Sequence, residues 1–439
     1  MFTHIRLKNY KSLIDLDVDF EKKKNHPKKA IIIYGENGSG KSNFVSAFYT
    51  LYQSMQTLSL RKKIQSLLEN DEKNDDDISF LKFMLKTSND TEMIIKECKT
   101  IYSTDNMELQ FDFIIGDKCG SYLLVYDDKE IVEEKLSYVL NKNKCLLFDL
   151  TKEKKIINKK IFLDEAYASQ IHDYILQYEG KHTLLSILVN EREEKSKKYI
   201  EMNFHEALNE VLSFLKNVSV KVKSGTGERG KVMISHSMMS QLDSGKISLK
   251  NETELNNTET VLNEFFTHLY TDIKEVFYKK KIENEKIEFE LYFKKNLYGK
   301  IVDVPYHLES TGTQHLLNLF PYLLMAIEGN VVVIDELDTG IHDLLVHKIL
   351  NDIIPSIKGQ FIITTHNTML LDSNISPEYI YTFLLDKNAN KELVAITEFE
   401  NRTHPNLNYR NRYLKGMYGG IPHMDDIDFD ELHDMLDEF

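Results

Sequence analysis

The chain has 439 residues, of which 42% are hydrophobic and 28% charged, and its formal net charge is −14 at pH 7. This length predicts roughly three domains or fewer, with a core that needs no disulfides. The three cysteines, Cys98, Cys119 and Cys145, form no C-x-x-C pair, which argues against a disulfide scaffold, a structural zinc site and an iron–sulfur cluster. The acidic balance argues against nucleic-acid binding by the whole surface, although a local basic groove stays open.

The N-terminal segment MFTHIRLKNYKS lacks the basic and apolar regions of a signal peptide. The most apolar stretch, residues 316–327, is shorter than the about 18 residues that a membrane span needs, and it contains Asn318 and Pro321. These features predict a soluble protein with no membrane partner. The cysteine usage favours a reducing, cytoplasmic location.

The first elements predicted along the chain are strands. Alternating apolar residues predict two short strands between residues 5 and 20. The continuous apolar run AIIIY (30–34) is typical of a strand buried on both faces of a parallel sheet. Behind a glycine-rich segment, apolar residues at helical spacing from Phe44 to Met55 predict a helix.

The middle of the chain is less regular. Alternation around 108–115 and 121–126 predicts antiparallel strands, and residues 162–215 predict helices rich in Glu and Lys. Residues 224–259 are polar, which predicts a mobile segment, and KIEFELYF (286–293) predicts a further strand.

Buried strands and a helix return after residue 330. The expected elements are strands at 331–336 and 360–366, a helix at 341–354, and further strands at 379–385 and 392–399. The resulting fold class is α/β, in which a largely helical inserted lobe splits one domain.

We expect five segments along the chain. The first part of the α/β domain spans 1–56, and a mixed lobe of strands and loops spans 57–135. The largely helical lobe spans 136–300, the second part of the domain spans 301–424, and an acidic tail spans 425–439. The tail has apolar residues at helical spacing, so it is expected to dock into a basic partner or to pack on its own domain.

The segment GENGSGKS fits the phosphate-binding pattern G-x-x-x-x-G-K-[ST], in the required context between a buried strand and a helix. Glycines let successive backbone N–H groups face the phosphates at a helix N-terminus. Lys41 is expected to reach the β- and γ-phosphates of ATP, and Ser42 to ligate Mg²⁺. The nucleotide-binding residues expected from this motif are Gly35, Glu36, Asn37, Gly38, Ser39, Gly40, Lys41, Ser42 and Asn43.

The second motif, VVVIDEL, is an apolar strand that ends in two carboxylates. Asp335 is therefore expected at the carboxyl edge of the sheet, where it can hold Mg²⁺ through water. Glu336 is then placed to orient and deprotonate the attacking water. The large separation of Lys41 and Asp335 in the chain fits an insertion between them and disfavours a hexameric AAA+ motor.

Together these segments resemble the head of an ABC-type ATPase of the SMC/RecF/overcoming-lysogenization-defect group. The motifs that carry the resemblance are LKNYKS, GENGSGKS, LESTGTQ, VVVIDELDTGIH and ITTHN. Within this group the chain is most similar to prokaryotic AAA-type ATP-binding proteins of abortive-infection systems. Its closing segment RYLKGMYGGIP resembles the C-terminal segment of those proteins.

The resemblance implies roles for further residues. Ser310 and Gly312 match the signature motif that contacts the γ-phosphate held by a second subunit, although a helix N-cap is the alternative for Ser310. His366 matches the switch histidine that senses the γ-phosphate and supports catalysis. Lys11 lies where family members touch the nucleotide, and an ordinary surface lysine is its alternative.

The resemblance also places Asp338 and His342 in a loop that crosses a dimer interface, while no glutamine is identified as the family's Q-loop residue. It implies a homodimer, or a higher oligomer, in which two copies face each other head to tail around ATP and Mg²⁺. It further implies antiphage defence through an effector protein from a neighbouring gene, with a nuclease favoured. The alternatives are a RecF-like repair ATPase that binds nucleic acid and an ATP-dependent scaffold with negligible turnover.

Overall fold

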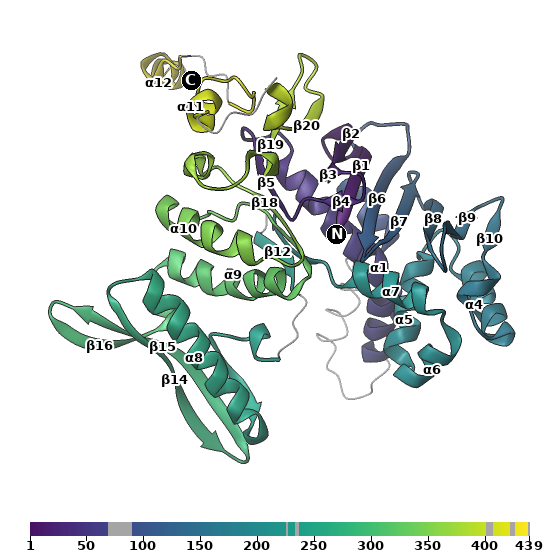
Figure 1. Cartoon of the computed structure of the whole chain (residues 1–439), viewed down its shortest axis with the longest axis horizontal. Coiled ribbons are helices and arrows are strands. Elements are labelled where there is room, and N and C mark those ends of the chain that lie inside the picture. Colours follow the sequence, from purple (N-terminus) through teal and green to yellow (C-terminus); the bar gives the residue numbers. More distant parts are fainter. Residues whose placement is uncertain (69–89, 225–226, 233–236, 401–406, 422–425, 438–439) are drawn as a thin grey trace.

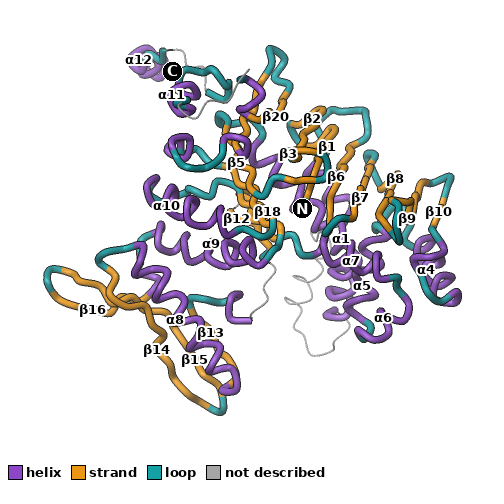
Figure 2. The backbone as a smooth tube through the Cα atoms, viewed as in Figure 1, coloured by secondary structure: helices purple, strands orange, loops and turns teal. Residues whose placement is uncertain are grey.

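The structure is a computed structural model, shown in Figures 1 and 2. The residues that it describes are 1–68, 90–224, 227–232, 237–400, 407–421 and 426–437. None of the helices within these ranges combines the length and the apolar composition needed to cross a membrane.

A seven-stranded sheet forms the centre of the molecule. Its strands, in spatial order, are β12 (Gly227–Lys231), β11 (Ser219–Ser224), β17 (Val331–Ile334), β18 (Gln360–Thr364), β5 (Ala30–Tyr34), β19 (Ile380–Leu385) and β20 (Lys391–Ala395). The five inner strands are parallel, and β12 and β20 pair antiparallel at the two edges. The strands predicted from apolar runs at 30–34, 331–336 and 360–366 are confirmed as β5, β17 and β18.

Alternate residues of these parallel strands face two separate cores. On β5, Ile31 and Ile33 pack in the core that includes α1 (Lys41–Leu68), whereas Ile32 and Tyr34 pack in the opposite core. The opposite core contains α9 (Thr311–Glu328) and α10 (Asp343–Ile353), which lie together on one side of the sheet in Figure 1. Burial on both faces explains why these strands read as continuous apolar runs.

A second, antiparallel sheet also has seven strands. Their order is β10 (Lys155–Ile157), β9 (Lys144–Thr151), β8 (Ile131–Val139), β7 (Lys118–Tyr126), β6 (Met107–Ile115), β1 (Phe2–Tyr10) and β2 (Leu13–Asp19). The buried Gln360 amide joins this sheet to the central one, because it accepts a hydrogen bond from Phe2 N (2.8 Å) and donates one to Phe2 O (2.9 Å). The expected boundary between residues 135 and 136 falls inside β8, so it does not separate two units.

Helices and a further sheet follow the antiparallel strands. The predicted helices within 162–215 are confirmed as α4 (Glu165–Gln177), α5 (Leu184–Glu194), α6 (Lys197–Asn203) and α7 (Glu206–Lys216). After β11 and β12 the chain forms β13 (Ser244–Ser248), α8 (Glu252–Leu269), β14 (Ile273–Glu283), β15 (Lys286–Leu297) and β16 (Lys300–Pro305).

The expectation of a largely helical lobe over 136–300 is therefore wrong. Nearly half of β14 is an exposed run, KKKIE, in which four of the five residues are charged and whose composition resembles a solvated helix. It is a strand because it pairs along its length with β15, while its other half packs against α8. Within the predicted mobile segment 224–259 the structure describes β12, β13 and the first turns of α8, whereas residues 225–226 and 233–236 lie outside the described part.

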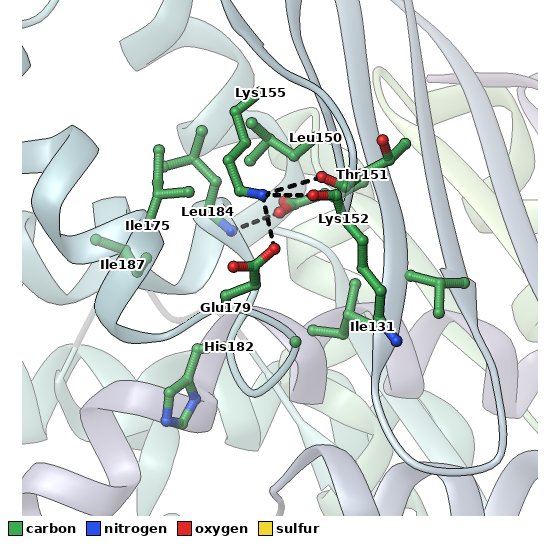
Figure 3. A pocket seen from close by; sticks show the side chains of 13 residues that line it. Ile131, Leu150, Thr151, Lys152, Lys155, Ile175, Glu179, His182, Leu184 and Ile187 are labelled. Atoms are coloured by element: carbon green, nitrogen blue, oxygen red, sulfur yellow. Dashed lines mark hydrogen bonds and ion pairs between the residues drawn. The ribbon is translucent and has the colours of Figure 1, made fainter.

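A small cavity of about 40 Å³ lies between the antiparallel sheet and the helices α4 and α5 (Figure 3). In it, Lys155 Nζ donates to the carbonyl oxygens of Thr151 (3.3 Å) and Lys152 (3.0 Å) and pairs with Glu179 at 2.7 Å. The volume is close to that of one water molecule, so the cavity is too small for a nucleotide.

Glu134 lines the same cavity and fixes the start of α5. Its carboxylate accepts hydrogen bonds from the backbone N–H groups of Leu184 (2.5 Å) and Leu185 (3.2 Å) and from the hydroxyl of Tyr122 (3.0 Å). Complete burial raises the pKa of Glu134 to about 7, and these three hydrogen bonds oppose the rise. The carboxylate therefore has a structural role at a helix N-terminus.

Candidate nucleotide site

The predicted phosphate-binding loop lies between β5 and α1, at the carboxyl edge of the central sheet. Lys41 is the first residue of α1, and its Nζ donates to the carbonyl oxygens of Gly35 (2.7 Å) and Glu36 (2.9 Å). Gly38 has a φ of 80°, which favours glycine, and the space where a side chain would lie is open. An open loop, a helix N-terminus and a lysine together form a suitable cradle for phosphates.

Asp335 directly follows β17 and is almost completely buried. Its Oδ1 accepts a hydrogen bond from Thr364 Oγ1 at 2.7 Å, and Ser42 lies within hydrogen-bonding reach. Burial raises the pKa of Asp335, while the hydrogen bonds from Thr364 and Ser42 oppose the rise. The structure thus brings the two predicted metal ligands together, and their hard oxygen atoms suit Mg²⁺.

Glu336 lies beside Asp335 in a strained backbone conformation, with a φ of 45°. Its backbone N–H donates to Thr364 Oγ1 at 2.7 Å, so one hydroxyl links both acidic residues to the end of β18. Its carboxylate forms an ion pair with Lys223 and accepts a hydrogen bond from Thr339 at 3.3 Å. Burial acts to raise the pKa of Glu336, but the hydrogen bond and charge of Lys223, the charge of His366 and the hydrogen bond from Thr339 together lower it.

His366 follows β18 by two residues and joins the same group of charges. Its backbone N–H donates to Asp338 Oδ2 at 3.0 Å. His366 is exposed as a residue, but its imidazole is partly desolvated. This desolvation lowers the pKa of the imidazole, and the charge of the Lys41 ammonium lowers it further. Electrostatic interactions with Asp338, Glu336 and Asp335 oppose this shift. Lys41, Asp335, Glu336 and His366 therefore form one cluster.

Ser310 is the N-cap of α9, because its hydroxyl accepts a hydrogen bond from Thr313 N at 3.2 Å. The helix-capping role that the sequence left open for Ser310 is thus confirmed. The contact of Ser310 with a second subunit stays a prediction. Gly312 packs against the loop that follows Glu336: a Cβ at Gly312 would lie 2.5 Å from the carbonyl oxygen of Gly340. Only glycine allows this close approach.

Lys11 lies in the turn between β1 and β2, with a φ of 51°. Its backbone is fixed by Cys98 O and by the hydroxyl of Thr100, which donates to Lys11 O at 2.7 Å. The next residue, Ser12, is the one that contacts the phosphate-binding loop, since its Oγ accepts a hydrogen bond from Asn43 Nδ2 at 2.6 Å. The nucleotide contact of Lys11 stays a prediction.

Two lysines near the site were not identified from the sequence. Lys391 Nζ donates to Gly38 O (2.8 Å) and to Ser12 Oγ (2.6 Å), and Lys223 pairs with Glu336. Neither belongs to a motif, and each reaches the site only because its strand, β20 or β11, joins the central sheet. No signal in the sequence alone could have distinguished them from the other lysines.

The described part of the C-terminal segment, RYLKGMYGGI (412–421), packs against the start of the phosphate-binding loop. The ring of Tyr413, in α11 (Tyr409–Leu414), lies 5.4 Å from that of Tyr34, and its hydroxyl donates to Gly420 O at 3.0 Å. Gly420 has a φ of 70°; a Cβ there would overlap the hydroxyl of Thr382 and lie 3.3 Å from the Cα of Gly35. The segment therefore holds the base of the loop through a close glycine contact.

The comparison with protein families gives one match, "AAA domain, putative AbiEii toxin, Type IV TA system", over residues 31–372, well over half of the chain. No curated protein matches the chain. The solved structures similar to it include the SMC head domain from Thermotoga maritima, with 12% identity, 90% of this chain and 98% of that chain covered, and a TM-score of 0.39.

Two further SMC heads are similar. One is bound to the C-winged helix domain of ScpA, with 13% identity, 90% of this chain and 98% of that chain covered, and a TM-score of 0.43. The other has an extended coiled coil and is bound to the C-terminal domain of ScpA derived from Pyrococcus furiosus, with 14% identity, coverage of 90% and 95%, and a TM-score of 0.36.

The contact of Gly420 predicts that Gly420→Ala weakens nucleotide binding. The new Cβ must push the C-terminal segment away from Thr382 and Gly35, in addition to the cost of about 1 kcal/mol for a left-handed alanine. Thermal unfolding and equilibrium dialysis with a non-hydrolysable ATP analogue measure the two effects. Gly416→Ala is the control, because Gly416 has a similar φ of 74° but open space around it. Equal effects of the two variants would contradict the role of the close contact.

Proposed function

This chain belongs to the AAA-domain family of AbiEii-toxin type, and from that premise we propose that it binds ATP and hydrolyses it to ADP and phosphate. The observation that carries the proposal is the cluster of Lys41, Asp335, Glu336 and His366 at the carboxyl edge of the central sheet. Ligands of open α/β sheets bind at this edge.

Each residue of the cluster has a distinct role in the proposed reaction. The backbone N–H groups of residues 35–42 and the Lys41 ammonium hold the phosphates. Mg²⁺, when bound, neutralises phosphate charge, and Ser42 and Asp335 supply oxygen ligands for it. Glu336 accepts a proton from water as the water oxygen attacks the γ-phosphorus and the bond to the leaving ADP oxygen breaks. His366 donates a hydrogen bond to the γ-phosphate.

We further propose that two copies close head to tail around ATP. Ser310 supports this arrangement because it is exposed at the N-terminus of α9, an 18-residue helix whose positive end can face a phosphate of the other copy. The loop that carries Asp338 and Gly340 lies against the same helix start, through the contact of Gly312 with Gly340. The two predicted interface segments are therefore neighbours.

The biological output that we propose is abortive-infection defence in the cytoplasm, through an effector protein from a neighbouring gene, with a nuclease favoured. Direct DNA binding has less support, because most lysines in two lysine-rich stretches of the chain, 152–160 and 279–281, form ion pairs with carboxylates. In the group 279–281, Lys279 pairs with Asp303 (3.5 Å), Lys280 with Glu259 (3.2 Å) and Lys281 with Glu283 (2.6 Å), and in 152–160 Lys152, Lys154 and Lys155 also pair with carboxylates.

A tag on this chain, expressed with its native neighbouring genes, tests that output. We expect a stoichiometric partner protein in the purified material, identified by mass spectrometry and sized with and without ATP. The DNA content of the same material is the matched measurement. A bare dimer that retains DNA fragments would instead favour a RecF-like repair ATPase.

Glu336→Gln should lower turnover by about 10²- to 10⁴-fold, because the amide cannot accept the proton of the attacking water. ATP binding should persist, since the phosphate-binding loop is unchanged. Phosphate release and equilibrium dialysis measure the two quantities, and Lys41→Ala, which removes the phosphate-binding cation, should reduce both. If Glu336→Gln turned over ATP at the wild-type rate, the role of Glu336 would be wrong.

Ser310→Asp should abolish ATP-dependent dimerisation without loss of stability. Aspartate is as good an N-cap as serine, so α9 keeps its cap, but its negative charge would repel the γ-phosphate held by the second copy. Size-exclusion chromatography with light scattering, in the Glu336→Gln background with ATP, measures the dimer. Ser310→Ala is the converse control, because it removes the cap, at a cost of about 1 kcal/mol, but adds no charge. A dimer that survives Ser310→Asp contradicts the contact.

A further inference from the structure

The ion pair between Lys223 and Glu336 occupies the carboxylate that the proposed reaction needs. Both side chains are partly exposed, 36% for Lys223 and 29% for Glu336, so neither is trapped in the core. Thr339 donates to the same Oε2 atom that the lysine contacts. A carboxylate oxygen that is held by an ammonium is a weaker proton acceptor, and Glu336 Oε2 is held in this way.

The position of Lys223 is set by strand pairing. In the parallel register of β11 with β17, Ser219 lies opposite Val332 and Lys221 opposite Ile334. The pairing continues past the end of β17, because Asp335 N donates to Lys221 O (2.8 Å) and Lys223 N donates to Asp335 Oδ2 (3.4 Å). Residues two apart on a strand share a face, and Lys223 is the one that reaches the acidic pair.

We propose that Lys223 is a latch that holds Glu336 in a resting state, and that the ion pair between them must break before Glu336 can act as a base. This inference rests on the proposed ATPase function and assigns to the site a positioning residue that regulates it. Lys223 does not need to contact the nucleotide in this role. Its effect is exerted on Glu336 alone.

The connections of β11 indicate what would release the latch. Only Asn217 and Val218 separate α7 from β11, so a displacement of α7 is transmitted directly to the strand. At its other side β11 pairs with the edge strand β12, whose Arg229 forms an ion pair with Glu97 in α3 (Thr91–Cys98) at 2.9 Å. A displacement of α7 therefore has a short route to the strand that carries Lys223, while Glu336 is fixed to β18 through Thr364.

The test replaces Lys223 by methionine, which keeps most of the length of the side chain but removes the charge. Lys223→Met should raise the turnover number for ATP by about five-fold, which is the size expected for loss of a partly exposed ion pair, without a change in the affinity for ATP. Lys223→Arg preserves the ion pair and should hydrolyse ATP more slowly than Lys223→Met. Steady-state phosphate release gives the turnover, and equilibrium dialysis with a non-hydrolysable ATP analogue gives the affinity.

Lys221→Met is the matched control on the same strand. Lys221 pairs with Glu228 of β12, away from the acidic residues, so its loss should leave turnover unchanged. Thermal unfolding of each variant checks that the chain is folded. An equal rise in Lys221→Met would show that a loosened strand, and not the charge of Lys223, causes the effect.

Two other results would overturn the latch. A lower turnover or a weaker ATP affinity in Lys223→Met would make Lys223 a residue that assists the nucleotide. If neither the wild type nor Lys223→Met exceeds Glu336→Gln in turnover, the proposed ATPase function itself fails, and the latch with it. The comparison with Glu336→Gln therefore separates the failure of the latch from the failure of the function.

Discussion

The parallel pairing of β17, β18 and β5 is the constraint on which the rest of the structure depends. Parallel strands end at the same edge of a sheet, so residues that follow them meet even when hundreds of positions separate them in the chain. The Thr364 hydroxyl makes this meeting specific, because it donates to the Asp335 carboxylate and accepts the backbone N–H of Glu336. Without that register, Lys41 and the two carboxylates would be unrelated.

The same edge concentrates charge, and each charge has a local counterpart. Asp335 is stabilised by hydroxyl groups, Glu336 by the Lys223 ammonium, and Asp338 by the backbone N–H of His366. The carboxylates in turn oppose the fall in pKa that burial causes at Lys41. The geometry of these groups favours a nucleotide with a divalent cation.

The segments between the phosphate-binding loop and the acidic pair are structurally connected to the central sheet. The antiparallel sheet shares one core with α1, and β11 returns from the helices α4–α7 to become part of the central sheet. The helix α7 thus has a short covalent connection to β11, whose Lys223 contacts Glu336 through an ion pair. The C-terminal segment contacts the phosphate-binding loop directly, because Gly420 packs against Gly35.

The sequence by itself determined the elements with strong local signals: the buried strands β5, β17 and β18, the phosphate-binding loop, and the acidic pair at 335 and 336. Continuous apolar runs and a loop with a fixed pattern of glycines have few alternative structures, so they can be recognised without neighbours. Only the tertiary structure decided that the lysine-rich residues of β14 form a strand and that Lys223 and Lys391 reach the site. Strand pairing and ion pairs join residues far apart in the chain, and local composition carries no information about such partners.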